Sequence, residues 1–248
     1  MNDFYESLKV IQAHEVDFTN KLRIDSLFVL LQDSAAAHAD LLNLGYKALI
    51  EHNFAWVLSW VKVEIDSLPR FGEEINIKTW PKKKYKLYSL RDFYVYSNKG
   101  QIIIRATTAW LPINMKTKRI IDTSSLPALI NYQENESAID ELPGKIAEPV
   151  KREFVFSRQM RYTDLDLNQH VNNIRYIKMI MDSYSKEQYE KSRLKSIVVN
   201  FVSESKYNDE IEIYRSIEGS EESAIIEGAN ISTSKIVFQA NLKWEILK

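Results

Sequence analysis

The residues best suited to chemistry in this chain of 248 residues lie in one stretch, 161–176, which reads RYTDLDLNQHVNNIRY. It places carboxylates, amides and one imidazole just before an apolar run with helical spacing: Asp164, Asp166, Asn168, His170, Asn172 and Asn173. Such a set can transfer protons and bind oxygen atoms. It also has a purely structural interpretation, because Asn172 or Asn173 can cap a helix by accepting a free backbone N–H. Spacing alone favours neither interpretation.

The elements that must position these residues occur twice along the chain. Residues 60–77 align without gaps with 196–213, and 102–110 align with 236–244. Residues 17–34 align more weakly with 166–183. The offset shrinks along the chain, because the first copy has a longer connection after its helix, and internal self-similarity of this kind is the signature of a repeated structural unit. The sequence therefore predicts a duplicated architecture.

Each copy begins with a helix and continues with strands. Apolar residues recur at helical spacing from Leu27 to Leu42 and from Ile174 to Tyr184. Period-two alternation at 75–80 and 211–214 predicts strands, and polar residues at 97–100 and 218–221 predict hairpin turns. One helix before a run of antiparallel strands, made twice, predicts an α+β fold. Each unit would be a curled antiparallel β-sheet wrapped around a central α-helix.

The predicted boundaries follow from composition. The segment 131–150 is polar and acidic and contains Pro143, Gly144 and Pro149, so we expect it to link the two units. The N-terminal unit would then cover 1–130 and the C-terminal unit 151–248.

The two copies differ in their titratable groups. At aligned positions the first copy has Asp17, Thr19 and Lys21, whereas the second has Asp166, Asn168 and His170. Glu204 likewise aligns with Leu68. One active copy and one structural copy would leave this asymmetry, so the duplication favours a functional role for the second set.

Composition excludes several classes of protein. There is no cysteine, which removes disulfides, thiolate metal sites and cysteine nucleophiles. The formal net charge is −1, so no global charge favours nucleic acid or a membrane. No His, Asp and Glu pattern has metal-ligand spacing, and no glycine-rich phosphate loop occurs. We expect no metal, no cofactor and, without an apolar signal segment, a cytoplasmic location.

The chain resembles the acyl-acyl-carrier-protein thioesterases of plants and bacteria, a family with a double hotdog fold. The resemblance covers almost the whole length. It rests on the following motifs and residues: 30–33 (LLQD), His38, 54–59 (FAWVLS), 105–110 (RATTAW), 166–173 (DLNQHVNN) and Tyr176. It implies two tandem hotdog units and hydrolysis of fatty acyl-[acyl-carrier-protein] thioesters. The implied partner is an acyl carrier protein that bears a 4′-phosphopantetheine-linked acyl chain.

The resemblance also implies catalytic roles for Asp166, Asn168, His170 and Glu204. Plant members commonly place a cysteine directly after that glutamate, where this chain has Ser205. The departure rules out a cysteine mechanism and favours direct attack by water. Glu204 and His170 are both candidates for the base, and the sequence leaves the choice open.

Negative charge on the thioester oxygen would need donors. We expect them among the backbone N–H groups of Val171, Asn172 and Asn173, at the start of the second helix. Glu204 is expected to be a buried carboxylate beside an apolar slot, which would be costly unless it is used or paired.

Other features have simpler interpretations beside functional ones. His38 on the apolar face of the first helix is expected in the core. Phe28, Trp56 and Trp60 are core residues or walls of an acyl slot. The basic run at Lys82, Lys83, Lys84 and Lys86 is either a solvated hairpin end or a landing patch for an acidic carrier protein.

Three alternative functions remain open at this stage. The same scaffold can act on acyl-CoA, or it can hydrate or dehydrate an acyl thioester. A non-catalytic acyl-thioester sensor is the alternative from another class. Pairing of two chains into a homodimer is also left open.

Overall fold

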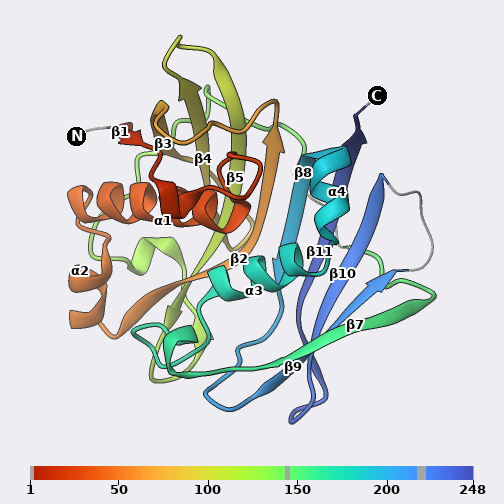
Figure 1. Cartoon of the computed structure of the whole chain (residues 1–248). Coiled ribbons are helices and arrows are strands. Elements are labelled where there is room, and N and C mark those ends of the chain that lie inside the picture. Colours follow the sequence, from red (N-terminus) through yellow and green to blue (C-terminus); the bar gives the residue numbers. More distant parts are fainter. Residues whose placement is uncertain (1–2, 143–145, 217–221, 248) are drawn as a thin grey trace. The chain divides into compact units, whose positions relative to one another are not determined.

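The computed structural model describes residues 3–142, 146–216 and 222–247. Contacts divide the chain into two compact units, Met1–Leu142 and Pro143–Lys248. Each unit has one long helix and an antiparallel sheet (Figure 1). No helix in the described ranges is long and apolar enough to cross a membrane.

The sheet of the first unit has the strand order β1-β3-β4-β5-β2, and β6 pairs with β5. Its strands are β1 (Tyr5–Val10), β2 (Phe54–Ile65), β3 (Glu74–Tyr85), β4 (Tyr88–Ser97), β5 (Ile102–Asn114) and β6 (Arg119–Ile120). Its helices are α1 (Ile24–Leu41) and the short α2 (Tyr46–Glu51), with 3-10 turns at Ala13–Glu15 and Thr123–Ser125. Figure 1 shows α1 lying across one face of this sheet.

The second unit repeats the pattern with the strand order β8-β11-β10-β9-β7. Its strands are β7 (Arg152–Gln159), β8 (Ser192–Phe201), β9 (Glu210–Ser216), β10 (Ser223–Asn230) and β11 (Lys235–Ile246). Its helices are α3 (Asn173–Asp182) and α4 (Lys186–Lys191), with a 3-10 turn at Tyr162–Asp164. The predicted fold class, a curled sheet with a central helix made twice, is confirmed.

Sequence patterns explain the local structure. The predicted strands 75–80 and 211–214 lie within β3 and β9. At 97–100 the chain turns as predicted, with Gly100 at φ +74° and the Ser97 N–H bonded to the Gln101 carbonyl. The second predicted turn, 218–221, lies outside the described residues. Apolar residues on the strands of both units are fully buried, among them Ile77, Phe93, Ile104, Ile213 and Phe238.

The alignment of the two copies recurs in the backbone hydrogen bonds. The Leu22 N–H donates to the Pro69 carbonyl, and at the aligned positions the Val171 N–H donates to the Ser205 carbonyl. Asn20 and Gln169, which are also aligned, both have φ of 62°. Equivalent bonds at equivalent positions confirm that the two units repeat one backbone design.

The segment predicted as a linker is partly built into the first unit. The Gln133 N–H donates to the Pro81 carbonyl, and the Trp80 indole N–H donates to the Glu136 carbonyl. Trp80 also packs against Ala138 and Ile139, both buried. Residues 133–142, here called the strap, therefore cover one face of β3 and β4. Pro143 and Gly144, part of the predicted linker, lie outside the described residues.

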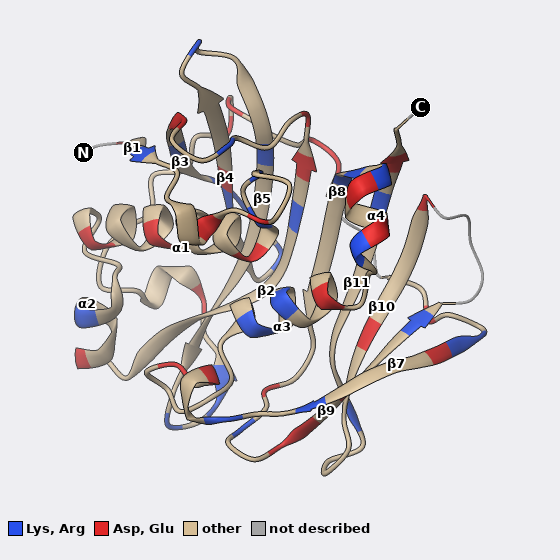
Figure 2. Ribbon diagram, viewed as in Figure 1, with Lys and Arg blue, Asp and Glu red and all other residues tan. Residues whose placement is uncertain are grey.

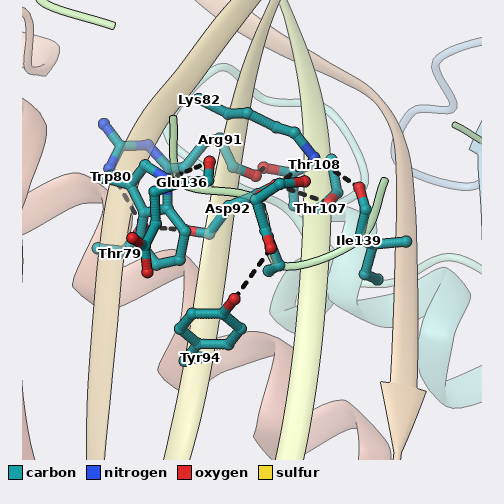
Figure 3. Close-up of polar contacts among 12 residues, drawn as sticks. Thr79, Trp80, Lys82, Arg91, Asp92, Tyr94, Thr107, Thr108, Glu136 and Ile139 are labelled. Carbon is teal, nitrogen blue, oxygen red and sulfur yellow. Dashed lines mark hydrogen bonds and ion pairs between the residues drawn. The ribbon is translucent and has the colours of Figure 1, made fainter. Parts of the chain in front are cut away.

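A buried ion pair holds the strap to the sheet. The Lys82 ammonium lies 3.1 Å from the Asp92 carboxylate and 2.5 Å from the Ile139 carbonyl (Figure 3). The same carboxylate accepts hydrogen bonds from Thr107 at 2.6 Å and from the Ala138 N–H at 2.6 Å. Burial raises the pKa of the Asp92 carboxyl, while these bonds and the Lys82 charge oppose the rise.

Breaking this pair is expected to destabilise the first unit strongly. Lys82→Met leaves an uncompensated buried carboxylate, which costs about 3–5 kcal/mol of unfolding free energy. Urea unfolding measures the loss. Lys84→Met is the matched control, since Lys84 pairs with Asp122 at the surface and such pairs contribute little. Equal losses for both variants would contradict the importance of the buried pair.

Candidate active site

The polar stretch 161–173 forms a tight loop that runs from a 3-10 turn into α3. The Asp166 carboxylate accepts the backbone N–H groups of Asn168 at 2.8 Å and His170 at 3.2 Å. The Asp166 N–H in turn donates to the His170 carbonyl at 2.8 Å. Asp166 therefore fixes the backbone of Asn168 and His170.

The loop of the first unit is built in the same way without the histidine. The Asp17 carboxylate accepts the N–H groups of Thr19 at 2.7 Å and Lys21 at 3.2 Å, and the Asp17 N–H donates to the Lys21 carbonyl. The shared aspartate thus has a structural task in both copies. What differs is the side chain that the loop presents.

Asp164 anchors the beginning of the loop. It is completely buried, and its carboxylate accepts the Arg161 N–H at 2.8 Å. Arg158 lies 3.0 Å and Arg175 lies 3.4 Å from the same carboxylate. Two cations and a backbone bond satisfy this buried charge, so Asp164 belongs to the scaffold.

His170 and Glu204 come together in the second unit, although they are distant in the sequence. The His170 Nε2 atom lies 3.2 Å from a Glu204 carboxylate oxygen. The side chain of His170 is 21% exposed and that of Glu204 is 55% exposed. The expectation that Glu204 is buried is therefore wrong, because the segment after β8 turns its side chain towards solvent.

The backbone that brings them together is well defined. The Val171 N–H, beside His170, donates to the carbonyl of Ser205, beside Glu204, at 2.8 Å. Asn172 caps α3, because its side chain accepts the Ile174 N–H at 2.9 Å. The capping prediction is confirmed, so Asn172 has a structural role here.

Two of the three predicted oxyanion donors are already engaged. The Val171 N–H bonds to the Ser205 carbonyl, and the Asn172 N–H bonds to the Asp164 carbonyl at 2.9 Å. The prediction for these two amides is corrected, because each has a backbone acceptor that holds the loop. Asn173, at the first helical position, remains a candidate donor.

The other predicted site residues are more dispersed. The Asn168 side chain is exposed at the loop. Phe28 is buried in α1. Trp60 packs with Leu90 and Ala109, whereas Trp56 joins a separate cluster and donates from its indole to the Leu44 carbonyl at 3.1 Å.

Lys82, the first residue of the predicted lysine patch, is not at the surface. Lys82 is 3% exposed and paired with Asp92. A register shift between Pro81 and Lys83 breaks the alternation of β3, so Trp80, Pro81 and Lys82 are all buried. Lys83 is half-buried, while Lys84 and Lys86 are exposed.

Two buried hydroxyls lie beside the site, those of Tyr176 and Ser205. The sequence brings in Tyr176 through the resemblance and Ser205 as a departure from it, but neither was predicted to be a site residue. The aligned residues of the first copy are Leu27 and Pro69. A comparison of every aligned pair for polarity, of the kind that singles out Glu204 against Leu68, would have found them. Within the described ranges, no group of three or more His, Cys, Asp or Glu side chains could hold a metal ion.

Comparison with known proteins agrees with this architecture. Residues 2–125 match the family model of the acyl-ACP thioesterase N-terminal domain, and residues 147–246 match that of the C-terminal domain. A solved acyl-ACP thioesterase from Bacteroides thetaiotaomicron is 29% identical, with a TM-score of 0.82 over 98% of both chains. The 12:0-ACP thioesterase from Umbellularia californica is 17% identical, with a TM-score of 0.78 over 100% of this chain and 99% of that one, which shows the fold.

The fold and its paired units therefore define a double hotdog protein. More particularly, the chain belongs to the acyl-ACP thioesterase family. Among curated relatives, the oleoyl-acyl carrier protein thioesterase 2 of Arabidopsis thaliana is 25% identical over 226 residues. That alignment takes in 83% of this chain and 60% of the relative, so the chain spans about three fifths of the relative's length.

The two aspartate loops make a matched pair for mutation. Asp166→Ala and Asp17→Ala each remove a carboxylate that accepts backbone N–H groups, so each is expected to cost about 0.5–2 kcal/mol of stability. Only Asp166→Ala is expected to lower the rate of the reaction proposed below, because only that loop positions His170. Thermal unfolding and kcat, measured on both variants, check this. Equal kcat losses would show that the effect passes through stability alone.

Proposed function

We propose that this protein hydrolyses fatty acyl thioesters carried on an acyl carrier protein, giving free fatty acid and the holo-carrier protein. The observation that carries the proposal is the His170–Glu204 pair, 3.2 Å apart, on a backbone whose first copy lacks both groups. Membership of the acyl-ACP thioesterase family supports the choice of substrate.

The chemistry needs a base, a site for negative charge and a proton for the leaving group. We assign the base to Glu204, whose exposed carboxylate is open to water. The His170 imidazole contacts one oxygen of this carboxylate and orients it. Water attacks the carbonyl carbon as the carboxylate takes its proton. The C–S bond then breaks, and the proton passes through the pair to the departing thiolate.

The remaining groups support this step. The Asn173 N–H at the start of α3 is assigned to the developing oxyanion, where the helix dipole favours negative charge. Asn168, exposed on the loop, is assigned to orient the water or the carbonyl oxygen. Asp166 keeps both His170 and Asn168 in place through their backbone. Phe28, Trp56 and Trp60 are assigned to the acyl slot.

Release of free thiol from a chain-length series of acyl-carrier-protein and acyl-CoA thioesters tests the activity. Glu204→Ala and His170→Ala are each expected to lower kcat by about 10²–10⁴, the usual contribution of general acid–base catalysis. Lys21→Ala, at the position equivalent to His170, is expected to keep the wild-type rate.

The results separate the alternatives. Thiol release from acyl-CoA alone would exclude acyl-carrier-protein thioesters as the substrate but would leave the thioesterase activity in place. Binding of acyl thioesters without thiol release would replace the hydrolase with a sensor or a lyase. Activity that survives in both site variants would show that the pair is not the catalytic centre.

We place the carrier-protein docking surface on the first unit, at Lys83, Lys84 and Lys86. Lys84 contacts Asp122 at 2.6 Å, and three exposed cations, Lys116, Lys118 and Arg119, precede Asp122 in the chain. Lys and Arg are otherwise interspersed with Asp and Glu in both units (Figure 2). An acidic carrier would therefore need such a local group of cations.

Charge reversal tests the surface. Lys86→Glu combined with Lys118→Glu is expected to lower kcat/KM for acyl-carrier-protein substrates and to weaken its salt dependence. The kcat/KM for acyl-CoA should stay unchanged, because the catalytic pair is untouched. Lys243→Glu, an exposed position in the second unit, is the control. An equal loss for both kinds of substrate would contradict a docking role.

A cytoplasmic location and a homodimer stay predictions.

A further inference from the structure

Two hydroxyl groups lie buried behind the His170–Glu204 pair. Tyr176 in α3 is 1% exposed, and Ser205, next to Glu204, is 0% exposed. Neither the Tyr176 phenol oxygen nor the Ser205 side-chain oxygen makes a hydrogen bond of normal geometry within the described chain. They are nevertheless neighbours. Burial raises the pKa of Tyr176 to about 12, and the hydroxyl and backbone N–H of Ser205 oppose that rise.

Leaving these hydroxyls unpaired costs stability. An unsatisfied buried polar group carries a penalty of about 1–3 kcal/mol. The first unit shows an apolar solution on the same backbone, with Leu27 at the position of Tyr176 and Pro69 at that of Ser205, both buried. The polar pair therefore stands where the shared fold does not require it. It stands only in the unit that holds His170 and Glu204.

The surroundings of the phenol show how it can act. The Tyr176 ring is packed against Phe238, with centroids 5.4 Å apart, and against Phe201, at 6.5 Å. The phenol is thus fixed in the core and has no direct access to substrate. Ser205, by contrast, follows Glu204 in the segment between β8 and β9, and its carbonyl accepts the Val171 N–H beside His170.

We propose that Tyr176 is a positioning residue of the active site, whose buried hydroxyl beside Ser205 fixes the backbone that holds Glu204 against His170. Ser205 directly follows Glu204, so a group that holds Ser205 also limits the positions of Glu204. The inference rests on the proposed thioesterase function.

Tyr176→Phe is the decisive variant, because it removes one oxygen and keeps the ring packing. We expect kcat to fall about 10- to 100-fold, as small misplacements of reacting groups do, with KM unchanged. The thermal midpoint should stay equal or rise, because an unpaired buried hydroxyl has been removed. A residue with a purely structural role would not combine lower kcat with retained stability.

Tyr184→Phe is the matched control. The Tyr184 hydroxyl is also buried without a hydrogen-bond partner among the described residues, but its ring packs on Trp244, 4.9 Å away, beyond the other end of α3. This variant should match Tyr176→Phe in stability and the wild type in kcat. Ser205→Ala and the double variant complete a cycle. If both hydroxyls act through one contact, their effects on log kcat should not add.

The outcomes separate this inference from the proposed function. Hydrolysis by the wild type with an unchanged kcat in Tyr176→Phe overturns the inference alone. A parallel fall in kcat and in thermal midpoint also overturns it, since the role would then be structural. No thiol release by the wild type overturns the proposed function and the inference together.

Discussion

The hydrogen bond from the Val171 N–H to the Ser205 carbonyl is the contact on which the candidate site depends. It joins the loop before α3 to the segment after β8, two parts of the chain that are distant in sequence. His170 precedes the donor and Glu204 precedes the acceptor, so one backbone bond places both side chains. The same bond between Leu22 and Pro69 in the first unit shows that it belongs to the fold rather than to the chemistry.

Duplication separates scaffold from function in this protein. Where both units share a group, as with Asp17 and Asp166, the structure gives it the same backbone partners. Where they differ, Glu204, Ser205 and Tyr176 replace the apolar Leu68, Pro69 and Leu27, and His170 replaces Lys21. The first unit thus serves as an internal reference for what the hotdog backbone needs in the absence of His170 and Glu204.

Electrostatic constraints of another kind shape the first unit. One face of its sheet holds the buried Lys82–Asp92 pair, and the strap supplies the Ala138 N–H and the Ile139 carbonyl that complete it. A buried carboxylate needs such partners, because removal from water is costly unless every lone pair is occupied. The strap is therefore part of the unit's packing as well as a connection between units.

Much of this protein was determined by the sequence alone. The internal repeat, the helix-then-strands order and the cap at Asn172 follow from local patterns and from comparing the two copies. That comparison also singled out His170 and Glu204, and the family resemblance implied their roles. These features depend on nearest-neighbour chemistry and periodicity, which a sequence displays directly. Only the tertiary structure decided which groups remain available. It assigned the Val171 and Asn172 amides to backbone carbonyls, turned Glu204 towards solvent and buried Lys82 at a register shift. Those outcomes depend on long-range hydrogen bonds and strand register, which no local pattern encodes.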